Sequence, residues 1–100
     1  VLFRSLNPDG VEPYLNLGAL LRSEGRFREA SQLLAGLLRK GHKEPILHLS
    51  YAIINDEAAN YPEAIVHYRR YLAEAPQGSD RAVVAERLKI LEGHQASRSR

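Results

Sequence analysis

Two stretches of the chain decide the fold: Gly18–Ala30, with the sequence GALLRSEGRFREA, and Ala52–Ala64, with the sequence AIINDEAANYPEA. The second stretch repeats the layout of the first, and each has a glycine or alanine at both ends. An aromatic residue, Phe27 or Tyr61, stands shortly before each closing alanine. Antiparallel helices approach closely where they present small residues. The two stretches therefore predict two similar helix–turn–helix units.

Other positions recur 34 residues apart, the interval that separates Gly18 from Ala52. The pairs are Glu29 and Glu63, Leu15 and Leu49, and Leu38 and Leu72. A fixed period of this length is typical of stacked supersecondary units. We expect bulky side chains to fill the layers beside the small residues. The candidates are Leu17, Leu34, Tyr51, Tyr68 and Tyr71.

These residues resemble the tetratricopeptide repeat (TPR), a helix hairpin with a period of about 34 residues. The resemblance covers residues 11–44 and 45–78, and Pro76 stands where the family places its repeat-ending proline. His42 replaces that proline in the first repeat, and Tyr14 and His48 stand where the family prefers Trp or Leu. The resemblance implies an all-α fold: a right-handed α–α superhelix of two TPR hairpins plus a C-terminal capping helix.

The ends of the chain extend this interpretation. Pro8 precedes Pro76 by twice the period, so residues 1–10 are interpreted as the end of a preceding repeat. The chain would then be the C-terminal fragment of a TPR array; the alternative is an ordinary Asn-Pro-Asp-Gly turn at residues 7–10. Residues 1–5 resemble a translated sequencing-adapter remnant and are set aside as candidate non-native sequence.

Helix signals place four helices near residues 13–24, 27–40, 45–58 and 61–75. Asn60 is the expected cap of the fourth helix, which should stop before Pro76. A fifth helix, residues 79–93, should begin with Ser79 or Asp80 as its cap. Glu86 falls on the small-residue position in repeat register, so this helix is interpreted as a cap that no further helix covers. Residues 94–100 are expected to be a disordered tail.

Composition narrows the function classes. The 100 residues are 44% apolar and 26% charged, as in a soluble helical chain, and no stretch approaches the length of a membrane span. There is no cysteine, so disulfides and thiolate sites are excluded and the compartment stays open, with the cytoplasm slightly favoured. Net charge alternates (+2, −2, +2) over residues 11–44, 45–78 and 79–100. This pattern argues against nucleic acid as a partner.

The sequence predicts no catalytic, cofactor or metal site, and hence no enzyme. No two histidines have the helical spacing that a metal pair on one helix requires. His48 and His67 could converge across helices, but we interpret them as surface or partly packed imidazoles. Asp56 and Glu57 are adjacent and point in different directions on a helix, so we expect them to solvate a helix end.

The resemblance implies one functional surface, the concave groove lined by the first helix of each repeat. Leu15, Ala19 and Ser50 stand where some TPR proteins carry the donors of a carboxylate clamp, which argues against such a clamp. An apolar strip could instead bind an amphipathic or extended peptide. The alternative, that Leu15 and Leu49 pack between repeats, stays open. The groove positions in the family's register are Leu15, Asn16, Ala19, Arg22, Leu49, Ser50, Ile53 and Asp56.

The expected function is therefore a protein–protein interaction module that binds a protein or peptide. The alternative is a non-catalytic, substrate-positioning TPR segment of a larger enzyme. Because two repeats are fewer than such arrays usually need, we also expect self-association through an uncovered N-terminal face. The candidates for exposed apolar residues there are Leu6, Leu17 and Leu21.

Overall fold

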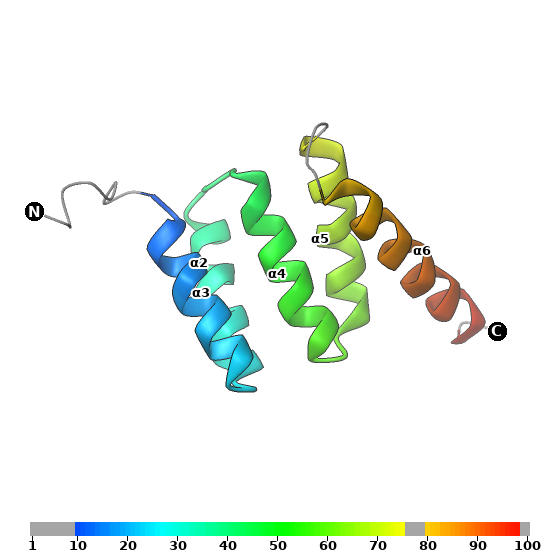
Figure 1. The fold of residues 1–100 in the computed structure, drawn as a ribbon, viewed down its shortest axis with the longest axis horizontal. Helices are drawn as coiled ribbons and strands as arrows, with labels where there is room; N and C mark the ends of the chain where they lie inside the picture. Colours follow the sequence, from blue (N-terminus) through cyan, green and yellow to red (C-terminus); the bar gives the residue numbers. More distant parts are fainter. Residues whose placement is uncertain (1–9, 76–79, 99–100) are drawn as a thin grey trace, which may run out of the picture.

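The computed structural model describes residues 10–75 and 80–98, and these form five helices and no strand (Figure 1). The all-α prediction is thus confirmed. Helices α2 and α3 form one antiparallel hairpin, α4 and α5 a second, and α6 packs on α5. The first helices of the two hairpins, α2 and α4, also contact each other. The helices are α2 (Glu12–Ser23), α3 (Phe27–Arg39), α4 (Pro45–Glu57), α5 (Tyr61–Glu74) and α6 (Arg81–Arg98).

The two hairpins turn in the same way, at positions one sequence period apart. Gly25 and Ala59 both adopt the left-handed conformation, with φ of 77° and 64°. In each turn the amide of the next residue donates to a carbonyl near the end of the first helix, which satisfies an oxygen that the helix itself leaves free. These bonds join Arg26 to Leu21 at 2.9 Å and Asn60 to Asn55 at 2.8 Å. The repeated spacing therefore corresponds to a repeated backbone geometry.

Small residues lie at the helix contacts, as the sequence predicts. Ala30, Ala52 and Ala64 are fully buried. A Cβ atom added to Gly18 would lie 3.5 Å from Cδ2 of Leu34, an ordinary van der Waals distance. Position 18 therefore has room for alanine, the residue found at the equivalent position 52.

Helix α4 contributes to both hydrophobic cores. Leu47 and Ile54 pack in the core beneath the first hairpin, together with Leu34. Leu49 and Ala52 pack in the second core, between α4, α5 and α6. Since one rigid helix supplies side chains to both cores, the hairpins are coupled through apolar burial.

Helix α6 is docked on the second hairpin through an apolar stripe. Val84, Leu88 and Leu91 are buried against the second hairpin. Arg81 lies at the start of this helix and donates to the carbonyl oxygens of Leu72 and Ala75, both at 2.6 Å, which closes the C-terminal end of α5. Glu86 is exposed on this helix.

The predicted end of this helix near residue 93 is wrong, because α6 continues to Arg98. Residues 94–98 are therefore helical rather than a disordered tail; residues 99–100 lie outside the described residues. A glycine in a helix costs only about 1 kcal/mol relative to alanine, which is too little to stop a docked helix at Gly93. The ring of His94 also contacts that of Tyr61 edge to face, with centroids 5.6 Å apart.

Two finer predictions also need correction. Asn60 stands at the N-cap position of α5, but its side chain makes no capping bond. Its side-chain amide instead donates to Oδ1 of Asn55 at 3.1 Å. Leu21 is buried at 9% exposure, so the prediction that it is an exposed apolar residue is wrong, whereas Leu17 is 44% exposed. The predictions for Leu6, Pro8, Pro76 and Ser79 fall outside the described residues.

Overpacking a fully buried small position should destabilise the fold. We expect Ala30→Leu or Ala64→Leu to lower the free energy of unfolding by about 1–3 kcal/mol, because the extra atoms force the helices apart. The matched controls Ala58→Leu and Ala96→Leu alter exposed alanines and should change it far less. Urea denaturation measures all four variants. Equal losses at the four positions would contradict the assignment of the helix contacts.

Exchanging glycine and alanine should have opposite effects on stability at the two turns. An L-residue in the left-handed conformation costs about 1–2 kcal/mol, so Ala59→Gly should stabilise the protein by about 0.5–1 kcal/mol after the entropy of glycine is counted. Gly25→Ala should destabilise it by about 1 kcal/mol, although no atom lies within 4 Å of the added Cβ. Thermal unfolding should show shifts of opposite sign; shifts of the same sign would contradict the equivalence of the turns.

Candidate functional site

The eight predicted groove residues lie on the two neighbouring helices α2 and α4. Asn16 and Ala19 are exposed, and most of the others are half-buried. Leu49 is only 5% exposed and packs in the second core, so it does not line an exposed groove. Leu15 is half-buried against the first core but still borders the surface. The apolar strip is therefore shorter than the sequence predicts.

Five of the eight residues surround one small cavity of about 60 Å³ between α2 and α4. Ile53 and Leu15 supply apolar wall, and the cavity floor reaches Leu34 and Ile54 of the first core. A cavity of this size has room for a small apolar side chain but not for an aromatic ring. The groove residues around it are Leu15, Ala19, Arg22, Ser50 and Ile53.

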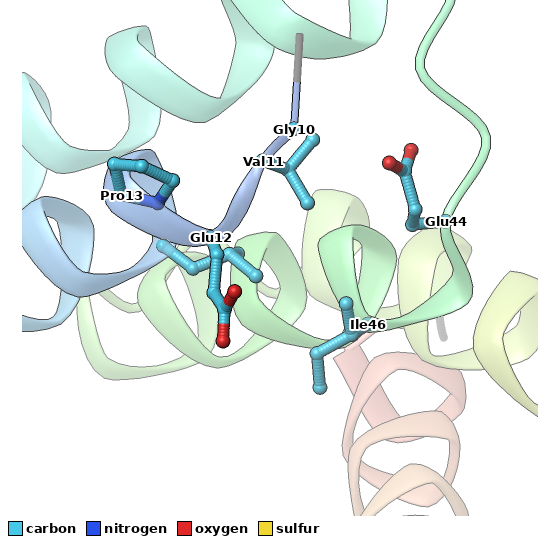
Figure 2. A pocket seen from close by; sticks show the side chains of 7 residues that line it. Gly10, Val11, Glu12, Pro13, Glu44 and Ile46 are labelled. Carbon is cyan, nitrogen blue, oxygen red and sulfur yellow. The ribbon is translucent and has the colours of Figure 1, made fainter. Parts of the chain in front are cut away.

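A larger hollow of about 410 Å³ opens beside this cavity, and Leu15 lines both. Figure 2 shows that its walls come from the start of α2 and from the residues around the start of α4. Val11 and Ile46 supply apolar surface there, and Glu12 and Glu44 supply carboxylates. This hollow could not be predicted from the sequence, because it forms between the beginnings of two helices that are not adjacent in sequence.

Asp56 is the most constrained groove residue. Its carboxylate, 10% exposed, accepts two hydrogen bonds from Arg87 of α6, from Nε at 2.8 Å and from Nη2 at 2.7 Å. It also accepts one from the hydroxyl of Tyr68 on α5 at 2.9 Å. Paired bonds to a charged group are among the strongest in proteins. Asp56 therefore ties three helices together and is not available as a ligand-binding carboxylate.

The neighbouring carboxylate of Glu57 reaches the opposite way. It accepts a hydrogen bond from Nη1 of Arg22 on α2 at 2.8 Å. The prediction that Asp56 and Glu57 merely solvate a helix end is thus wrong. Because adjacent helical residues point in different directions, the two carboxylates join α4 to the helices on its two sides.

The Asp56 cluster shifts the pKa values of its members. Burial alone would raise the pKa of Asp56, but the hydrogen bonds from Arg87 and Tyr68 hold that pKa below its ordinary 3.8. Burial and the bond to Asp56 together raise the pKa of Tyr68 well above its ordinary value. The tyrosine therefore stays a neutral donor and the aspartate stays charged over the physiological range.

His48 and His67 do converge across α4 and α5, on a different part of the second hairpin. Their Nδ1 atoms are 2.9 Å apart, and the side chains are only 10% and 16% exposed. Among the described residues, no group of three or more histidine, cysteine or acidic side chains could hold a metal ion. No helix within the described residues, 10–75 and 80–98, is long and apolar enough to cross a membrane.

The Asp56 cluster should contribute more to stability than the Glu57 pair. We expect Asp56→Asn to lower the free energy of unfolding by about 1–3 kcal/mol, since it leaves the partly buried donors Arg87 and Tyr68 without a charged acceptor. Glu57→Gln removes a pair whose side chains are 36% and 45% exposed, so it should cost less than about 1 kcal/mol. Chemical denaturation of both variants tests this order; a larger loss for Glu57→Gln would refute it.

Comparisons with known proteins identify no relative of this chain. No protein-family model, no curated protein and no solved structure matches the chain significantly.

Proposed function

We propose that this chain is a TPR-type protein–protein interaction module, the C-terminal part of a helical-repeat array. In this proposal its two hairpins and α6 form a right-handed superhelix whose concave face binds an extended peptide or a helix. One observation carries the proposal: the turns at Gly25 and Ala59, one period apart, have the same conformation and the same closing hydrogen bonds. A repeated hairpin that places its first helices side by side supports a continuous binding surface.

The surface between α2 and α4 suggests what the ligand offers. The cavity beside Ala19 and Ile53 suits a small apolar side chain. Ser50 lines this cavity and Asn16 is exposed on α2, and their hydroxyl and amide groups can bond the backbone of an extended segment. Arg22 is already paired with Glu57, and Asp56 with Arg87, so charge contributes little. The ligand we infer is therefore an uncharged, partly apolar peptide segment.

The binding test uses a random peptide library displayed on phage and selected against the immobilised chain. Selected peptides are then measured by calorimetry against the unmodified protein and two arginine variants. Ala19→Arg fills the edge of the cavity, whereas Ala85→Arg makes the same change at an exposed position of α6. Arginine is compatible with a helix at both positions.

We expect Ala19→Arg to weaken binding about tenfold or more, because a central contact in a small apolar cavity carries much of the binding free energy. Ala85→Arg should leave the affinity unchanged. The proposal fails if no peptide is selected, or if the selected peptides bind both variants equally well.

A further inference from the structure

The His48–His67 contact has a feature that packing alone does not require: two ring nitrogens face each other. Their Nδ1 atoms are 2.9 Å apart, the ring planes are inclined by 18°, and the centroids are 5.1 Å apart. Such a contact is attractive only when one Nδ1 carries a proton and the other accepts it. The contact therefore depends on the protonation state of the two rings.

The other nitrogens of the pair each lie near a carboxylate. Nε2 of His48 is 3.9 Å from Oε1 of Glu74, and Nε2 of His67 is 3.7 Å from Oε2 of Glu63. These distances are too long for hydrogen bonds but short enough for electrostatic attraction. The edge of His67 also meets the ring of Tyr51, with centroids 4.7 Å apart.

The contact between the Nδ1 atoms limits how many protons the two rings can bind. The neutral pair holds two protons, one of them between the Nδ1 atoms. A third proton can bind at the free Nε2, facing a glutamate, and the central bond survives. A fourth proton must sit on the accepting Nδ1, so that two N–H groups of two cations point at each other, and the contact is lost.

We propose that the His48–His67 contact is a proton-sensitive latch that holds α4 against α5 in neutral solution and opens in mildly acidic solution. The two rings form part of the wall of a hollow of about 560 Å³ between α5 and the segment that joins α3 to α4. Opening the latch loosens the second hairpin beside that hollow. The latch is independent of the proposed peptide-binding surface.

The surroundings of the pair set the direction of the effect. The charged or titratable groups that face it are Tyr51 on α4, Glu63, Arg70 and Glu74 on α5, and His42 and Lys43 before α4. Burial lowers the pKa of His48, and burial together with the charge of His48 lowers the pKa of His67. The two glutamates oppose these shifts without cancelling them.

The sign of the pH dependence follows from these shifts. Both folded pKa values lie below the ordinary 6.5, so the unfolded chain binds more protons as the pH falls below 6.5. The free energy of unfolding must therefore decrease as the pH falls from 6.5 through the folded pKa values. Asp56, whose pKa is held below 3.8, contributes a separate loss only at lower pH.

The test measures unfolding by urea at about pH 7.5 and about pH 5 for the whole chain and two double variants. His48→Asn/His67→Asn removes the pair and keeps a polar group near each Nδ1 position. His42→Asn/His94→Asn removes the two other imidazoles and serves as the matched control. We expect the folding equilibrium constant of the unmodified chain and of the control to fall about tenfold or more between the two pH values. The pair variant should change less than about threefold.

Equal pH dependence in the two double variants, or none in the unmodified chain, would overturn the proposal. A nuclear magnetic resonance titration of the unmodified chain decides the matter if the pair variant does not fold. We expect the imidazoles of His48 and His67 to titrate in two linked steps below pH 6.5, with loss of contacts between α4 and α5 at the second step. Independent titration of the two rings with those contacts intact would show that there is no latch.

Discussion

Close approach of antiparallel helices at small side chains is the constraint on which the rest of this structure depends. Gly18 faces Leu34, and Ala30, Ala52 and Ala64 have no exposed surface. Where helices come this close, larger neighbouring side chains can interdigitate and exclude water. The two cores on either side of α4 therefore follow from a few positions that carry almost no side chain.

Helix α4 combines this apolar packing with polar links to both sides. Its adjacent carboxylates reach Arg22 on α2 and Arg87 on α6, while Leu47 and Leu49 enter different cores. In the link to α6 the side chain of Asp56 is largely buried, whereas both side chains of the link to α2, Arg22 and Glu57, are exposed. Helix α4 should thus be held more firmly to the second core and α6 than to α2 by its charged groups.

Much of the fold was accessible from the sequence, because the period of the small residues and the turn signals act locally. Helix boundaries near Gly25, Gly41 and Pro45 followed from the conformations that these residues permit. The end of α6 did not, since docking outweighs the small cost of Gly93. A sequence pattern within one helix cannot predict the contact between Tyr61 and His94, because these residues lie on different helices.

The candidate site was predictable only in part. The repeat register brought Leu15, Ala19, Arg22, Ser50 and Ile53 to one cavity, but it could not tell that Leu49 faces inward. The partners of Asp56 and the facing nitrogens of His48 and His67 depend on side chains that meet across helices. Spacing along one helix carries no information about such encounters.

The most direct test of the repeated geometry is a nuclear Overhauser experiment on the assigned chain. We expect contacts between the α-protons of Gly18 and the methyl groups of Leu34, the pair that meets in the first hairpin. We also expect the equivalent contact one period later, between the methyl group of Ala52 and the ring of Tyr68, both buried in the second core. Finding both contacts would support one crossing geometry in two hairpins. Finding the first contact without the second would show that the sequence period does not correspond to a structural repeat.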